Sequence, residues 1–328
     1  MSMRTLSFKD KTLIGIIVVL AALYPVITNS YMKFVLITGV VNAILVVGMH
    51  FIFGLTGQLH LAMSAFWGVG SYAFALSITK MGWPFWPAVG FAAVLVGLLG
   101  LLLGFPTLRL KGFYLAITTI GFGEIVRLIL LNWSPVTGGV FGIAGIPRPT
   151  IGPLRFGSNT SFYYLILVML GLLTLAARMI EHSKYGAALR AVHDDELAAE
   201  AVGLNTTMLK VLAFVLCGIY AGIGGAMYAS LMQYISPEVY TLERSQMLAM
   251  MLVIGGMGSL PGAIMGSVLL TFLPEVLRFL QQWYLAVYGA IVIVIIVYRP
   301  TGLWGAWEML VQRLSAAFGR RGNTHGTA

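Results

Sequence analysis

Cysteine and charge are both scarce in this chain of 328 residues. Cys217 is the single cysteine, which excludes an intramolecular disulfide and any paired-cysteine redox or zinc motif. Asp, Glu, Lys and Arg together make up only 9% of the residues. An ordinary soluble domain carries far more charge on its surface, so a soluble enzyme is excluded.

Sequence motifs that bind nucleotides or carry out catalysis are also missing. The chain has no GxxxxGK[ST] loop to hold a nucleotide phosphate, and no HExxH or GxSxG motif. The most metal-like string is His193 to Glu196, but four consecutive side chains point in different directions and cannot converge on one ion. We therefore expect no catalytic residues, no metal and no cofactor.

Long apolar runs are what the chain does contain, since 59% of its residues are hydrophobic and its mean hydropathy is +0.91. A run of about 20 apolar residues crosses a bilayer as a helix. The sequence predicts an all-α polytopic integral membrane protein with about ten transmembrane helices, some of them broken or re-entrant. The expected spans are 12–28, 34–53, 61–79, 86–105, 113–131, 162–180, 210–231, 245–260, 262–280 and 284–298.

The basic residues indicate how these spans are oriented. The first run resembles a signal peptide but lacks a small-x-small cleavage site, so we interpret it as an uncleaved helix. With the N-terminus inside, thirteen Lys and Arg residues fall on the cytoplasmic side and six on the other. This asymmetry predicts that both termini are cytoplasmic. The same charges are dispersed over loops, which argues against nucleic-acid binding.

A charged segment at 181–209 interrupts the apolar pattern and is expected to form a pair of short helices in the cytoplasm. Asp194 can cap the second helix, with Asp195 and Glu196 in its first turn and Gly203 as a left-handed stop. A small apolar face beside Glu200 suits docking into a groove of another protein. The alternative is a solvated loop.

Polar residues inside the apolar runs are candidates for a translocation path. Glu124 and Arg127 stand three residues apart in one span, where ionisable groups are costly. Gln58, Thr118 and Thr119 are weaker candidates. The alternatives are a structural ion pair for the first two residues and hydrogen bonding between helices for the others.

Glycine punctuates the runs in two ways. Small residues at four-residue spacing, such as Gly100 with Gly104 and Gly218 with Gly222, predict close helix packing. The string GGMGSLPG places glycine and proline where helical continuity is costly. It predicts a break that serves as a hinge beside the path, or else an ordinary tight loop between two spans. The hinge residues are Gly255, Gly256, Gly258, Pro261 and Gly262.

The domain organisation follows from these patterns. Residues 1–305 are expected to form one transmembrane domain that contains the 181–209 segment. Residues 306–318 carry apolar side chains at helical spacing and predict an amphipathic helix on the inner leaflet. Residues 319–328 are expected to be a disordered tail.

Several strings, taken in order along nearly the whole chain, resemble the LivM-type permease of branched-chain amino acid ABC importers. They are RLKGFYLAITTIGFGEIVRLI, NWSPVTGGVFGIAGIP, the Lys184–Asn205 segment, GGMGSLPGAIMGS and VYGAIVIVIIVYRPTGLWG. One departure is HLAMSAF at 60–66, where many relatives read close to SLGHAAF.

The resemblance implies a bacterial inner-membrane subunit that forms half of a translocation pathway without binding ATP itself. Its implied partners are a different, LivH-like permease subunit, two ABC ATPases and a periplasmic binding protein, all in a lipid membrane. It also implies that the charged cytoplasmic motif couples the permease to the ATPases. The residues at those positions are Arg190, Asp194, Asp195, Glu196 and Glu200.

Other functions stay open at this point. Within the importer class the substrate could be another amino acid, an amide or urea. Outside it, a membrane-embedded lipid-modifying enzyme would need converging acids, and Asp194 to Glu196 is the only acid-dense site. A self-sufficient channel or secondary transporter would need no ATPase partner.

Overall fold

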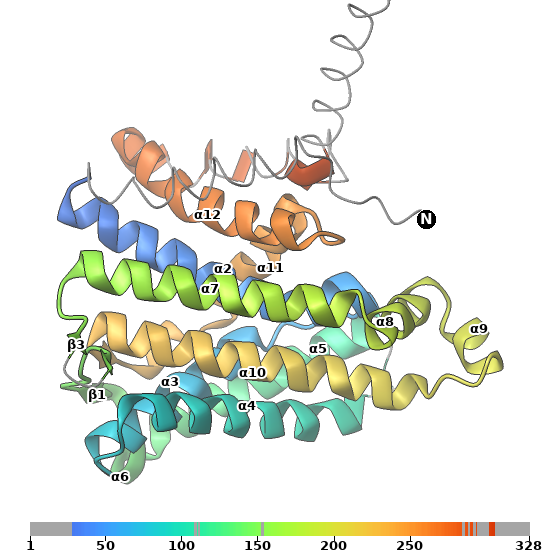
Figure 1. The fold of residues 1–328 in the computed structure, drawn as a ribbon, viewed down its shortest axis with the longest axis horizontal. Coiled ribbons are helices and arrows are strands. Elements are labelled where there is room, and N and C mark those ends of the chain that lie inside the picture. Colours follow the sequence, from blue (N-terminus) through green and yellow to red (C-terminus); the bar gives the residue numbers. More distant parts are fainter. Residues whose placement is uncertain are drawn as a thin grey trace, which may run out of the picture.

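The structure is a computed structural model and describes residues 28–107, 110, 112–151, 154–283, 286, 287, 289, 290, 293 and 302–305. Its long helices lie roughly side by side, and two short helices, α8 and α9, lie at one end (Figure 1). The long helices are α2 (Ser30–Thr56), α3 (Met63–Thr79), α4 (Phe85–Thr107), α5 (Phe113–Asn132), α7 (Asn159–Glu181), α10 (Thr206–Met232), α11 (Leu242–Gly255) and α12 (Leu260–Val276).

The centre of the bundle is α2, which packs against α7, α10 and α12. Small residues let neighbouring helices approach closely, as the glycine spacing predicts. A Cβ at Gly218 of α10 would lie 2.3 Å from the carbonyl oxygen of Val96 in α4, and one at Gly100 would lie 2.4 Å from that of Phe214. Close packing is confirmed at these positions.

The all-α membrane fold is confirmed, with six described helices long and apolar enough to cross a membrane: α2, α4, α5, α7, α10 and the helical stretch Leu260–Gln281. Two further predicted spans correspond to helices that are shorter than these six: α3 has 17 residues and α11 has 14. The predicted first span lies outside the described residues, apart from Thr28, and most of the last one does too. The 306–318 helix and the 319–328 tail also lie outside them.

The end of the bundle opposite α8 and α9 is closed by short elements that the sequence analysis did not predict. Between α5 and α7 lie α6 (Ser134–Thr137), η1 (Gly139–Phe141), β1 (Ile143–Ala144), β2 (Thr150–Ile151) and β3 (Leu154–Arg155). After α10 come β4 (Tyr234–Ile235) and η2 (Pro237–Val239), and η3 (Leu277–Trp283) follows α12. Strand β1 pairs with β4 and β2 with β3, both antiparallel.

One basic residue of this end is held against α7. The Arg148 guanidinium lies over the Phe162 ring, 5.4 Å from its centroid. Burial lowers the pKa of Arg148, although an arginine remains charged at neutral pH. The contact fixes the loop between β1 and β2 to the start of α7.

Candidate functional site

Helix α8 (Lys184–Asp194) is fixed to the end of α7 by a cap and an ion pair. The Ser183 hydroxyl accepts a hydrogen bond from the backbone N–H of Tyr185 at 3.2 Å, as a helix N-cap does. Arg190 donates to the carbonyl oxygen of Glu181 at 3.0 Å, and its guanidinium lies 3.9 Å from the Glu181 carboxylate. Arg190 therefore orients α8 on α7 and keeps part of its side chain exposed.

Helix α9 (Glu196–Ala201) is capped by Asp195, so the prediction that Asp194 is the cap was wrong by one residue. The Asp195 carboxylate accepts from the backbone N–H groups of Leu197 at 2.9 Å and Ala198 at 3.1 Å. Asp194 is instead the last residue of α8. The two acids are adjacent, and the chain turns between the helices one residue later than predicted. Glu196 does occupy the first turn of α9.

The other two predicted coupling acids bind the start of α10. Glu196 accepts a hydrogen bond from Lys210, and Glu200 accepts one from the Thr206 hydroxyl at 2.6 Å. These bonds tie α9 to α10. Gly203, with a φ of 85°, provides the left-handed stop as predicted.

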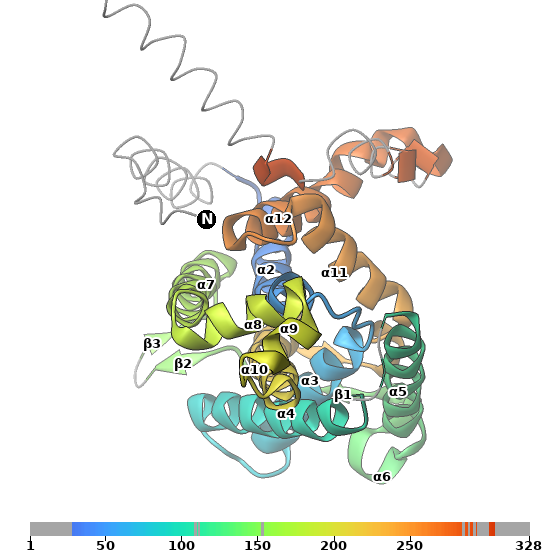
Figure 2. The same ribbon diagram turned by 90° about the vertical axis from the view of Figure 1, so that its right-hand side faces the viewer.

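The outward side of α9 is apolar. Leu197 is 72% exposed and Val202 is 77% exposed, and Ala198 and Ala201 are exposed beside them. We call these four residues the α9 face. Figure 2 views the bundle from the end that carries α8 and α9. The α9 face therefore presents apolar side chains on a short helix whose backbone is anchored by Asp195, Glu196 and Glu200.

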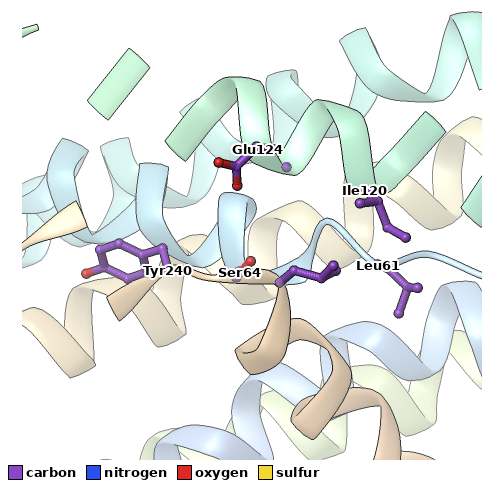
Figure 3. A pocket seen from close by; sticks show the side chains of 7 residues that line it. Leu61, Ser64, Ile120, Glu124 and Tyr240 are labelled. Atoms are coloured by element: carbon purple, nitrogen blue, oxygen red, sulfur yellow. The ribbon is translucent and has the colours of Figure 1, made fainter. Parts of the chain in front are cut away.

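A second feature is a cavity of about 240 Å³ next to α5. Figure 3 shows Glu124 and Ile120 of α5, with Leu61, Ser64 and Tyr240, among the side chains that line it. Its full lining is Leu61, Ser64, Ile120, Gly123, Glu124, Tyr240 and Leu242. The cavity thus combines aliphatic side chains and one tyrosine ring with the Glu124 carboxylate and the hydroxyl groups of Ser64 and Tyr240.

Glu124 and Arg127 form the predicted ion pair. The Arg127 Nε lies 2.9 Å from Glu124 Oε2, and the Glu124 side chain is 46% exposed against 23% for Arg127. Of the weaker path candidates, Thr119 supports the cavity, since its hydroxyl accepts from the N–H of Leu61 at 3.0 Å. Gln58 and Thr118 line no part of it. Gln58 donates to Thr56, and Thr118 donates to the carbonyl of Tyr114.

A serine pair at the cavity was missed by the sequence analysis. The Ser245 hydroxyl of α11 donates to the Ser64 hydroxyl at 2.7 Å, and it accepts from the N–H of Ser64 at 2.8 Å. Both residues are buried. They lie 181 positions apart in apolar runs, so no local pattern could have paired them.

The predicted interruption at Gly255–Gly262 is present as a tight turn. Helix α11 ends at Gly255, Gly256 has a φ of 122°, and Ser259 caps α12 by accepting from the N–H of Gly262 at 3.1 Å. Pro261 lies in the first turn of α12, where its missing N–H costs nothing. A Cβ at Gly258 would meet no described residue within 4 Å. The described cavity lining includes none of these residues, and their role as a hinge stays a prediction.

The described residues contain no group of three or more His, Cys, Asp or Glu side chains that could hold a metal ion. Within that part of the chain, the chemistry of the site consists of one ion pair, hydroxyl groups and aliphatic walls. This set can bind and orient a small polar molecule.

Comparisons with known proteins give the family. Residues 31–296 match the model for the branched-chain amino acid transport system permease component. The permease protein LivM of the Salmonella typhimurium high-affinity branched-chain amino acid transport system is 33% identical over 318 residues, covering 90% of this chain and 75% of that protein. LivH of Escherichia coli K12 is 25% identical, covering 83% and 93%, and the ribose import permease RbsC of the same strain is 26% identical, covering 88% and 92%.

No solved structure matches the chain. The resemblance drawn from the quoted strings is confirmed, because both the family match and the similarity to LivM extend over most of the sequence. The chain belongs to the family of permease components of branched-chain amino acid transport systems, which are multi-pass, non-catalytic membrane proteins.

Proposed function

We propose that this chain is one of two different permease subunits of an ATP-driven importer for branched-chain amino acids in a bacterial inner membrane. It forms half of the translocation pathway, couples through α8 and α9 to the ATPase subunits, of which the complex has two, and receives substrate from a periplasmic binding protein. The fold has about ten spans, with both termini and the α8–α9 pair cytoplasmic, as the distribution of Lys and Arg predicts. We expect the amphipathic segment 306–318, which lies outside the described residues, on the inner leaflet.

The observation that carries the proposal is the α9 face. A capped helix with Leu197 and Val202 more than 70% exposed lies at the end of a membrane bundle. Since Glu196 and Glu200 are bound to α10, they anchor this helix. Asp194 is exposed, and Arg190, although paired with Glu181, keeps part of its side chain exposed. An apolar helix face with charges beside it fits a groove on a partner protein.

The second permease subunit is expected against α5. The Glu124–Arg127 pair is exposed on a helix that spans the membrane, and exposed charges facing lipid are costly. A partner subunit or a watery path on this side removes that cost. The cavity beside Glu124 then opens onto the path between the two permeases, where the ammonium group of an amino acid would share the Glu124 carboxylate with Arg127.

The binding protein is expected at the opposite end of the bundle. Phe141 is 87% exposed on η1, within a segment whose Gly138, Gly139 and Gly142 all have positive φ. Such a fixed apolar tip suits a surface that must meet a partner repeatedly in one orientation.

The test compares Leu197→Glu with Leu197→Met in the complete transporter. The glutamate places a charge in the contact and should reduce ATPase co-purification and leucine uptake by about tenfold or more, whereas methionine conserves volume and polarity. Equal co-purification and uptake in the two variants would contradict the coupling role. If the parent transporter takes up urea or an amide and not leucine, isoleucine and valine, the protein is still an importer subunit but its substrate differs from the one proposed.

A further inference from the structure

The cytoplasmic end of α2 lies between the α8–α9 pair and the turn that joins α11 to α12. Helix α8 packs against α2, and α11 and α12 pack against α2 as well. This end of α2 therefore connects α8 with the helices that flank the turn at 256–259.

Gly54 contacts both sides of this junction. Its carbonyl oxygen lies 3.3 Å from Nδ1 of His193, which belongs to α8. A Cβ at Gly54 would lie 2.2 Å from the carbonyl oxygen of Met257 in the turn and 2.3 Å from Nδ1 of His50. One residue of α2 is therefore in contact with α8 and with the turn.

Two histidines reinforce these contacts with hydrogen bonds. His50 of α2 places Nδ1 3.0 Å from the carbonyl oxygen of Met257, and its ring is fully buried. A carbonyl oxygen only accepts, so Nδ1 carries the hydrogen in both His50 and His193 and donates it. Each histidine thus joins two segments that are far apart in the sequence.

The last turn of α2 is shaped to receive the His193 ring. Helix α2 ends at a left-handed Gly57, with a φ of 66°. A Cβ at Gly57 would lie only 2.9 Å from Cδ2 of His193. The other turn, at 256–259, approaches Gly302: a Cβ at Gly302 would lie 2.6 Å from the Cα of Gly256. The turn at 256–259 is therefore in close contact with α2 at Met257 and with Gly302 at Gly256.

We propose that His193 and His50 are positioning residues that transmit movement of α8 to the 256–259 turn through the end of α2. The proposal rests on the proposed function, because it assumes that α8 moves with the ATPases. In this mechanism α8 displaces Gly54, and Gly54 together with His50 displaces Met257 in the glycine-rich turn.

The first experiment measures leucine transported per ATP hydrolysed by the complete transporter in proteoliposomes. His193→Ala should lower this ratio about five- to tenfold, the amount that losing one ordinary hydrogen bond can account for. ATP hydrolysis and ATPase co-purification should persist. His193→Asn keeps an N–H donor near the position of Nδ1 and should restore most of the ratio. The control is His182→Ala, whose Nδ1 lies 2.9 Å from a carbonyl oxygen of its own segment, that of Arg178.

The second experiment follows the turn itself. A cysteine at Gly258, in a Cys217→Ala background, is labelled with a thiol reagent with and without a non-hydrolysable ATP analogue. Nucleotide should change the labelling rate in the parent and in His182→Ala, and leave it unchanged in His193→Ala.

The outcomes separate this inference from the proposed function. A nucleotide response of the same size in His193→Ala, or an unchanged transport ratio, overturns the inference while the coupling surface stands. A parent transporter that binds no ATPase through α8 and α9 overturns the proposed function and the inference together.

Discussion

Helices α2 and α5 are both long and apolar enough to cross a membrane, yet 89% of the most apolar window of α2 is buried inside the protein, against 28% for α5. The polar residues of the two helices differ accordingly. Asn42 of α2 donates to Thr271 of α12, whereas Glu124 of α5 pairs with Arg127 at the surface. In Figure 2, α5 lies at the edge of the bundle. The subunit therefore encloses α2, whereas α5 carries an ion pair at the outer surface of the subunit.

The largest expected effect is a loss of stability when a glycine of α2 is replaced by leucine, and the same replacement in α5 is the comparison. A Cβ at Gly48 of α2 would lie 2.5 Å from Cβ of Tyr220, whereas a Cβ at Gly121 of α5 would meet no neighbouring segment within 4 Å in the described part of the chain. Gly48→Leu should destabilise the isolated subunit by about 3 kcal/mol, because overpacked side chains force the helices apart. Gly121→Leu should leave its unfolding midpoint in detergent close to that of the parent. Similar losses in both variants would remove the distinction between the helices.

An intermediate effect is expected at the ion pair of α5. Glu124→Gln should lower uptake about tenfold, because Arg127 is left without its partner and the cavity without its carboxylate. The exchange Glu124→Arg with Arg127→Glu restores the pair but moves the carboxylate away from the cavity. If uptake stays low in the exchange variant, Glu124 belongs to the path. Recovery to the parent rate would make the pair purely structural.

The smallest effect concerns neutral polar side chains. Asn42→Ala removes a hydrogen bond between helices, at 3.0 Å, and should cost about 0.6 kcal/mol, the typical value in membrane proteins. Thr118→Ala removes a bond to the carbonyl of Tyr114 in its own helix and should change the unfolding midpoint less. Chemical unfolding of both variants in the same detergent measures the difference. A larger loss of stability for Thr118→Ala than for Asn42→Ala would contradict the contrast between α2 and α5.

Local signals in the sequence predicted the helices but not their surroundings. Apolar runs locate α2 and α5 equally well, because the membrane and the protein interior are both apolar. Gly256 and Pro261 signal the turn at 255–262 because each is costly within a helix.

Contacts between distant residues carried no such signal. The Ser64–Ser245 pair and the contact of His193 with Gly54 depend on how the helices assemble. The cap of α9 was assigned to Asp194 instead of Asp195 because two adjacent acids have the same capping chemistry, and only the backbone decides between them. Glu196 and Glu200 have partners on α10 that the helical pattern of their own segment does not indicate.

The most direct test of the account is photo-crosslinking from two residues of matched exposure. Ile125 on α5 is 58% exposed and Val168 on α7 is 60% exposed. A photoreactive amino acid at each position is irradiated in the assembled transporter in membranes. The expected result is that position 125 forms a crosslink with the second permease subunit and position 168 forms none with protein. A crosslink to that subunit from position 168, with none from position 125, would contradict it.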